Sequence, residues 1–196
     1  MILVVATIIA LLIALLRGGR LTRLAELRLR YAWLVLAAVV LQYLLVYDIL
    51  PWPALPGISL VYLLTVVSYL MLLGMVWANR SLPGMLLVGL GIASNLIVMM
   101  ANGGWMPITP EAVEWLGHSS RVAEGSVARV WGSKDIVLPR GSTRLWWLSD
   151  VFVLVPPFPV ASAFSIGDML TAVGVFWLLQ GTLIDRRGCS LCQKTA

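Results

Sequence analysis

Two aspartates in strongly apolar surroundings are the residues of this chain best suited to chemistry. Asp150 lies within the segment Trp-Trp-Leu-Ser-Asp-Val-Phe, and Asp168 follows Phe-Ser-Ile-Gly at the start of a long apolar run. Two carboxyl groups held close together in an apolar site share one proton, and such a pair can drive a water molecule onto an amide. Asp150 and Asp168 are therefore candidate catalytic residues.

Structural roles explain the same two residues. Ser165 and Asp168 stand just before an apolar run with the spacing of a capping box at a helix N-terminus. Asp150 could pair with Arg140 or Arg144, or close a turn through its own backbone. The sequence leaves the structural and the catalytic interpretations open.

A glycine-rich segment is the candidate binding site. It reads Asn-Gly-Gly-Trp-Met-Pro over residues 102–107. Consecutive glycines allow positive φ angles, and an asparagine side chain can bond to nearby backbone. The segment either ends a helix at a membrane surface or forms a backbone lip for a ligand, whose residues would be Asn102, Gly103, Gly104, Met106 and Pro107.

Motifs for metals, cofactors and nucleic acids are missing. His118 is the only histidine and has no further ligands at useful spacing, while Cys189 and Cys192 form a single Cys-x-x-Cys pair, which is half a zinc site. That cysteine pair belongs either to an inert reduced tail or to a lipidated one. Phosphate-binding, dinucleotide, serine hydrolase and zinc protease motifs are absent too. We expect no metal, no cofactor and no nucleic-acid partner.

The composition predicts the elements that must position these residues. The chain has 196 residues, of which 60% are apolar and only 12% charged, with a mean hydropathy of +0.94. Soluble domains are about 25% charged, so this chain has too little charge to cover a water-facing surface. It is expected to be a polytopic membrane protein, and its excess of basic residues favours membrane lipids as partners.

Five apolar runs are long enough, or nearly so, to cross a bilayer. A span needs about 20 apolar residues, with a range of roughly 17–25. We predict an all-α transmembrane helical bundle that forms a single domain over residues 1–196, with a structured extracytoplasmic loop over residues 102–165. In that loop, Thr109-Pro110-Glu111 should begin a short helix that Gly117 ends. The predicted spans are residues 1–16, 31–50, 58–77, 85–101 and 166–184.

The distribution of arginine predicts the orientation. The segment from Arg17 to Arg30 carries five arginines, and the short turn before the fourth span carries Arg80. Basic residues favour the cytoplasmic side, so we expect the N-terminus outside and the C-terminus in the cytoplasm. A sixth span over Leu145–Phe164 is the alternative. Asp150 and the nearby prolines disfavour it, because a central acid costs about 2.5–3.5 kcal/mol on insertion.

Polar residues within the predicted spans are few. In a bilayer such side chains usually bond to neighbouring helices, and no line of charged residues crosses the membrane here. This pattern argues against an ion pump and leaves a membrane-protein partner possible. The residues are Gln42, Thr65, Ser68, Asn95 and Gln180.

Several short motifs are spread over most of the chain. They are Arg17-Gly-Gly-Arg20-Leu, Gln42, Asn102-Gly-Gly-Trp-Met-Pro107, Leu148-Ser-Asp150 and Ser165-Ile-Gly-Asp168. Together they resemble a family of bacterial membrane proteins of unknown function. The resemblance implies a bacterial inner-membrane protein without an assigned activity.

A second resemblance covers about the C-terminal half. The segment from Pro157 to Gly174 is similar to the last-span motif of lipoprotein signal peptidases, and this implies that Asp168 is catalytic. Ser94-Asn95-Leu-Ile97 looks like the segment before the other catalytic aspartate, but Val98 stands where that acid should be. Asp150-Val-Phe152 resembles a nearby Asp-Phe element, so Asp150 would have to replace the missing acid.

The sequence therefore favours a non-catalytic interaction or lipid-binding protein that acts at the outer face of the membrane. The first alternative is an aspartyl-type membrane peptidase that uses Asp150 and Asp168. The second alternative is an accessory subunit of a larger membrane complex.

Overall fold

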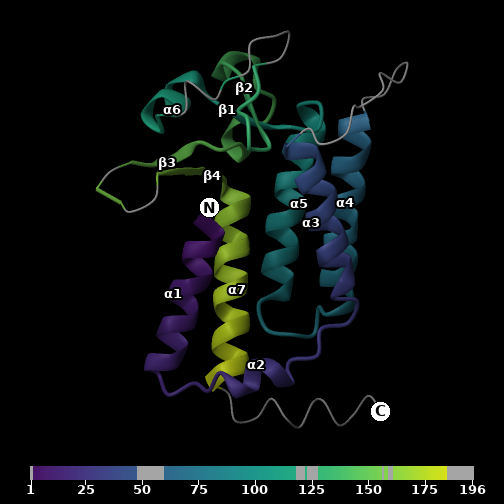
Figure 1. Ribbon diagram of the computed structural model, residues 1–196, viewed down its shortest axis with the longest axis vertical. Coiled ribbons are helices and arrows are strands. Elements are labelled where there is room, and N and C mark those ends of the chain that lie inside the picture. The colour runs from purple at the N-terminus through teal and green to yellow at the C-terminus, as the bar shows by residue number, and fades with distance from the viewer. Residues whose placement is uncertain are drawn as a thin grey trace.

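The protein is mostly helical. The computed structural model describes residues 2–47, 60–117, 122, 128–155, 157–158 and 161–184. Long helices account for most of these residues, and Figure 1 shows them lying side by side. They are α1 (Ile2–Leu16), α3 (Trp33–Val46), α4 (Leu60–Ala78), α5 (Met85–Ala101) and α7 (Ile166–Ile184).

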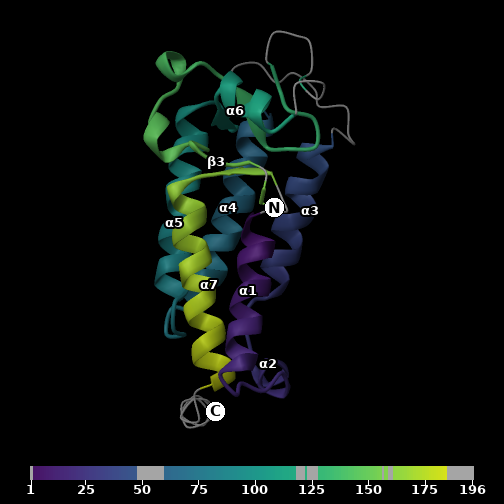
Figure 2. The ribbon, with the colours of Figure 1, turned by 90° about the vertical axis from the view of Figure 1, so that its left-hand side faces the viewer.

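The long helices form an open arc. Helix α7 packs against both α1 and α5, α5 also packs against α4, and α4 packs against α3. Helices α1 and α3 therefore stand at the two ends of the arc (Figures 1 and 2). Helices α1, α4 and α7 run in one direction, while α3 and α5 run in the other. This alternation puts residues 102–165 at one end of the helices, and puts the arginine-rich segment with the short helix α2 (Thr22–Glu26) at the other.

The contact between α5 and α7 depends on glycine. A Cβ atom on Gly174 would lie 2.7 Å from the Gly84 oxygen and from the Val88 side chain. A Cβ atom on Gly91 would collide with the backbone oxygen of Gly167. Small residues let two helix backbones approach closely. This tight contact fixes where α7 begins relative to α5.

The described residues between 102 and 165, which we call the cap, fold over one end of the helices. Strand β1 (Met106–Ile108) pairs in parallel with β2 (Asp135–Val137), and β3 (Phe152–Leu154) pairs antiparallel with β4 (Ser162–Phe164). The cap also contains α6 (Pro110–Trp115) and two 3-10 turns, η2 (Arg140–Ser142) and η3 (Trp146–Leu148). Its small apolar core consists of Ile108, Ala112, Val113 and Val130.

Side-chain hydrogen bonds hold the opposite end together. The Asn79 amide donates 2.8 Å bonds to the backbone oxygens of Arg30 and Met75, and its oxygen accepts a 2.9 Å bond from the Arg30 N–H. The Arg17 guanidinium donates to the Gln180 oxygen, and the Gln180 amide donates to the backbone oxygen of Ala10. These bonds fix the backbone at Arg30 and join the Arg17 side chain to α7.

The observed helices match the predicted runs closely. Helices α4 and α7 are each 19 residues long and apolar enough to cross a membrane, whereas α1, α3 and α5 are shorter apolar helices. The second run was expected to reach residue 50, but α3 ends at Val46, and Asp48 lies outside the described residues. Within its described part, Leu145–Phe164 forms η3, β3 and β4 rather than a long helix.

Candidate functional site

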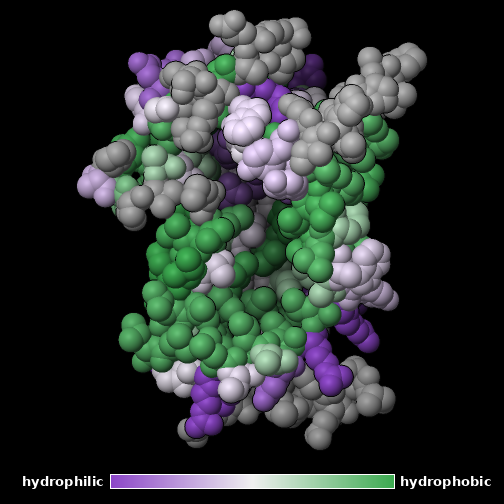
Figure 3. All heavy atoms as spheres, viewed as in Figure 1, coloured by the Kyte–Doolittle hydropathy of each residue, from purple (hydrophilic) through white to green (hydrophobic). Residues whose placement is uncertain are grey.

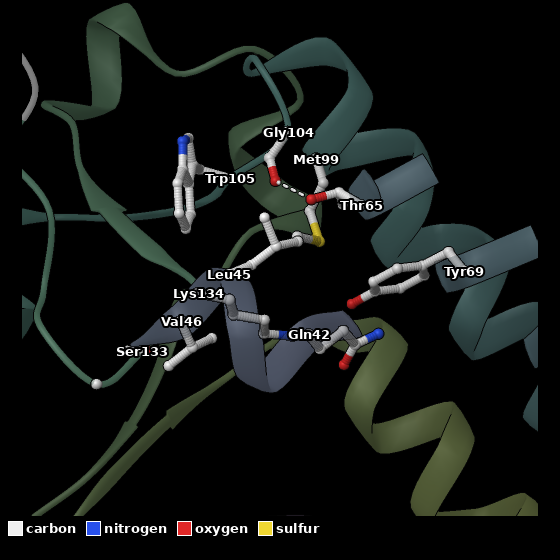
Figure 4. A pocket seen from close by; sticks show the side chains of 11 residues that line it. Gln42, Leu45, Val46, Thr65, Tyr69, Met99, Gly104, Trp105, Ser133 and Lys134 are labelled. Atoms are coloured by element: carbon white, nitrogen blue, oxygen red, sulfur yellow. Dashed lines mark hydrogen bonds between the residues drawn. The ribbon is translucent and has the colours of Figure 1, made fainter. Parts of the chain in front are cut away.

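A pocket of about 230 Å³ lies where the cap meets the ends of α3, α4 and α5. Figure 4 shows its lining side chains. Helix α3 provides one wall, helices α4 and α5 provide another, and the cap covers the space between them. The lining residues are Gln42, Leu45, Val46, Thr65, Tyr69, Met99, Gly104, Trp105, Gly132, Ser133 and Lys134.

Lys134 brings a positive charge into this pocket. Strand pairing fixes its backbone, because the Met106 N–H donates a 3.0 Å bond to the Lys134 oxygen just before β2. Its side chain extends among the lining residues in Figure 4. Burial by itself would lower the pKa of the ammonium, but Tyr69 and the carboxyl groups of Asp168, Asp150 and Asp135 together raise that pKa above its usual range. These neighbours favour the charged form of Lys134.

Tyr69 supplies a second donor. The residue is only 7% exposed, and its hydroxyl points into the space that Lys134 and Gln42 share (Figure 4). Among the described residues, neither the Tyr69 hydroxyl nor the Lys134 ammonium has a hydrogen-bond partner. Two such donors in one pocket favour a ligand that brings acceptor oxygens.

The remaining polar groups of the pocket are engaged with each other. The Gln42 amide donates to the Ser68 hydroxyl at 3.3 Å, and Ser68 donates in turn to the backbone oxygen of Thr65. The Thr65 hydroxyl donates a 3.2 Å bond to the backbone oxygen of Gly104. These bonds join α3, α4 and the cap, and they keep the walls of the pocket in place.

Gly104 is the one predicted binding residue that lines the pocket. Its φ angle is +94°, and a Cβ atom there would lie 2.8 Å from the Tyr62 Cα. Gly103 is exposed at the surface, while Met106 and Pro107 are buried in β1. Asn102 instead ends α5, because its amide donates to the backbone oxygens of Val98 and Arg144.

Asp168 caps α7, as its spacing from Ser165 predicted. The Asp168 N–H donates to the Ser165 hydroxyl at 3.1 Å, and the Ser165 N–H donates to Oδ2 of Asp168 at 3.2 Å. The Asn95 amide donates a 2.9 Å bond to Oδ1, and the Asn95 oxygen accepts from the Ser165 hydroxyl. Both carboxylate oxygens thus accept hydrogen bonds that anchor the start of α7 to α5.

Asp150 has a different environment. It is 4% exposed, and its backbone N–H donates to the Pro107 oxygen at 3.2 Å. Oδ1 has no hydrogen-bond partner within the described part of the chain. Burial and then the Asp135 carboxyl group raise the pKa of Asp150 well above its usual value, although Lys134 lowers it. The predicted partner Arg140 instead places its guanidinium over the Trp146 ring.

Trp105 lines the pocket and Arg129 contacts three of its lining residues, and no pattern in the sequence singled out either of them. The Arg129 guanidinium donates to the backbone oxygens of Leu45 and Val46, at 3.3 and 3.0 Å, and lies 4.2 Å from the centre of the Trp105 ring. It therefore holds the last turn of α3 against the cap. Lys134 did carry one signal, since it is one of only two lysines among fourteen basic residues.

A metal centre finds no support in the part of the chain that the structure describes. No group of three or more histidine, cysteine, aspartate or glutamate residues there could hold a metal ion. His118, Cys189 and Cys192 lie outside the described residues.

Comparison with known proteins identifies a family but no activity. A family model described as a family of unknown function (DUF5317) matches residues 26–180, which is most of the chain. The chain therefore belongs to this family. Neither the curated proteins nor the solved structures contain a match.

Proposed function

We propose that this member of the DUF5317 family is a bacterial inner-membrane protein that binds a membrane lipid, without catalysis, at the outer end of five spanning helices. The pocket between the cap and helices α3, α4 and α5 is the binding site. The single observation that carries the proposal is that two donors facing one pocket, the Lys134 ammonium and the Tyr69 hydroxyl, have no hydrogen-bond partner among the described residues.

The helix surfaces support a membrane setting. Large apolar side chains are exposed along all five long helices, among them Leu36 on α3, which is 70% exposed. Figure 3 shows the resulting apolar band around the middle of the molecule, with hydrophilic residues at both ends. A helix of 19 residues is about 28 Å long, close to the roughly 30 Å of a bilayer core. In water this band would be a severe aggregation hazard.

The charges at the two ends support an orientation. The arginines of residues 17–30 and Arg80 gather at the end opposite the cap. Positive residues favour the cytoplasmic side, so the cap faces outward and the N-terminus begins outside. With this orientation the C-terminus lies in the cytoplasm.

The proposal is tested by lipid retention. The protein is purified in a mild detergent, and native mass spectrometry then counts the lipids that remain bound. We expect at least one retained lipid, and we expect Lys134→Gln to lose it. Arg140→Gln is the matched control, because it removes the same charge from the same end of the molecule but lies outside the pocket. A wild-type protein that retains no lipid contradicts the proposal, and retention of a second membrane protein instead would favour the accessory-subunit alternative.

A second candidate function is favoured by Asp150. Its unpartnered Oδ1 and its raised pKa resemble one half of a pair of aspartates that shares a proton, and Asp168 contributes to that raised pKa. The position that the peptidase resemblance assigns to the other acid holds Val98, which is fully buried in an apolar cluster. A peptidase would therefore depend on Asp150 together with Asp168. Such activity would appear as pH-dependent cleavage of a membrane-embedded peptide, and cleavage that survives both Asp150→Asn and Asp168→Asn would exclude this mechanism.

A further inference from the structure

We propose that the bound lipid is a phospholipid with a phosphodiester headgroup, whose phosphate accepts hydrogen bonds from Lys134 and Tyr69 and whose acyl chain lies in the furrow between α1 and α3. This inference rests on the proposed lipid-binding function. It adds the chemical class of the ligand and the path of its chain.

The charges around Lys134 select the headgroup. A phosphodiester carries one negative charge, which matches the single ammonium group of the pocket. Both carboxylate oxygens of Asp168 accept hydrogen bonds, and this carboxylate acts electrostatically on Lys134, so it would oppose a second negative charge on the ligand. A phosphomonoester carries about 1.5 to 2 negative charges at pH 7 and is disfavoured. A neutral diacylglycerol has no group to match the ammonium.

The open arc of helices provides the path for the chain. Helices α1 and α3 stand at its two ends, and Figure 3 shows a furrow between them with hydrophilic residues recessed at its upper end. The side chain of Val175 on α7 packs against the apolar cluster of α1 and α7 and also against the cluster of α3, α4 and α5. Val175 therefore closes the lower end of the furrow, two helical turns along α7 from Asp168.

Helix periodicity identifies the α3 residues along this path. Val39 lies three positions before Gln42 and seven before Val46, both of which line the pocket, so the three residues share one face of α3. Val39 is 54% exposed, and it continues the pocket wall towards the middle of the helix. The adjacent Val40 is 56% exposed but points about 100° away around the helix. These two valines form a matched pair for a test.

The experiment uses the full-length protein in nanodiscs that contain a phospholipid with a photoreactive group on its acyl chain. Crosslinking yield is measured against unlabelled phosphatidylethanolamine, phosphatidylglycerol, phosphatidic acid and diacylglycerol as competitors. We expect the two phosphodiester lipids to compete about tenfold better than phosphatidic acid or diacylglycerol. We also expect Lys134→Gln to reduce the yield about tenfold and Tyr69→Phe about threefold, since hydrogen bonds to charged groups are the stronger ones.

Bulky substitutions on α3 test the proposed path of the acyl chain. Val39→Trp should block the path and reduce crosslinking at least fivefold, whereas Val40→Trp should leave the yield unchanged. Glycerophosphoethanolamine, which has the same phosphodiester but no chains, should compete at least tenfold less well than the intact lipid. Equal effects of the two tryptophan variants, or equal competition by phosphatidic acid, would overturn the inference. If lipid still binds in those cases, the proposed function survives, whereas the absence of any lipid binding would remove both.

Discussion

Replacing Gly174 by alanine should destabilise the protein through a measurable overlap at the contact of α5 with α7. The new Cβ atom would lie 2.7 Å from the Gly84 oxygen and from Val88, whereas ordinary contact begins at 3.4 Å. The two helices must therefore separate by roughly 0.7 Å, and overpacking of this kind costs about 1–3 kcal/mol. The same substitution also gains up to about 1 kcal/mol of helix propensity, which partly hides the cost.

Gly74→Ala is the control that separates the cost of the overlap from the gain in helix propensity. Gly74 lies inside α4, and a Cβ atom there would meet only Leu34 at 3.9 Å, which is ordinary contact. Both variants gain the same propensity, so the difference between their free energies of unfolding measures the overlap alone. In a chain of this size 1 kcal/mol shifts the melting temperature by about 2–4 °C. Thermal unfolding in one detergent should place Gly174→Ala about 2–12 °C below Gly74→Ala. Equal melting temperatures would refute the close approach of α5 and α7.

Three further substitutions test the cap and the two ends of the helices. Asp150→Asn should remove a pH dependence of the free energy of unfolding. Because the pKa of Asp150 is raised in the folded protein, the wild type should lose stability relative to the variant as pH rises above the ordinary pKa of aspartate. The loss should be about 1.4 kcal/mol per pH unit until the raised pKa is reached. A difference in melting temperature that stays constant from pH 4 to pH 8 would contradict this. Asn79→Ala should cost about 2 kcal/mol and speed hydrogen exchange at Arg30, because it removes the side-chain bonds that hold that backbone; unchanged exchange there would be the opposing result. Gly104→Ala should cost about 1–3 kcal/mol, since alanine is strained at a φ of +94° and its Cβ would press on Tyr62, and a melting temperature equal to that of the wild type would argue against this backbone.

The positions of the long helices could be predicted because the signals are local. An apolar run bounded by charge or glycine defines each of them, and α5 and α7 have the predicted bounds. Local capping patterns were equally informative. The Thr109 hydroxyl accepts a hydrogen bond from the Ala112 N–H and caps the start of α6. Ser165 and Asp168 cap the start of α7 in the same way. Each of these features involves residues within one turn of each other.

The sequence predicted that polar residues within the helices bond to neighbouring helices, but it did not identify their partners. Gln42 bonds to Ser68 on the neighbouring helix, and Asn95 bonds to Asp168 on another. An isolated polar group in an apolar helix needs a partner, which is why cross-helix bonding could be expected. The identity of each partner depends on helix order, which periodicity does not contain.

The pocket could not be predicted, because its residues meet only through long-range pairing. Lys134 reaches Tyr69 because β1 and β2 pair across nearly thirty residues of sequence that show no periodic pattern. Tyr69 by itself looks like one more aromatic residue in an apolar run. The glycine-rich segment was a better guide, since Gly104 does border the pocket, but Met106 and Pro107 pack beneath it as a buried strand.

The most direct test of lipid binding is a structure of the protein determined by electron cryo-microscopy in nanodiscs that contain phosphatidylethanolamine and phosphatidylglycerol. We expect density for a headgroup within hydrogen-bond distance of the Lys134 ammonium and the Tyr69 hydroxyl, with a chain that continues beside Val39. A pocket without lipid, combined with lipid density only on outer helix faces such as that of Val40, would contradict both the site and the proposed function.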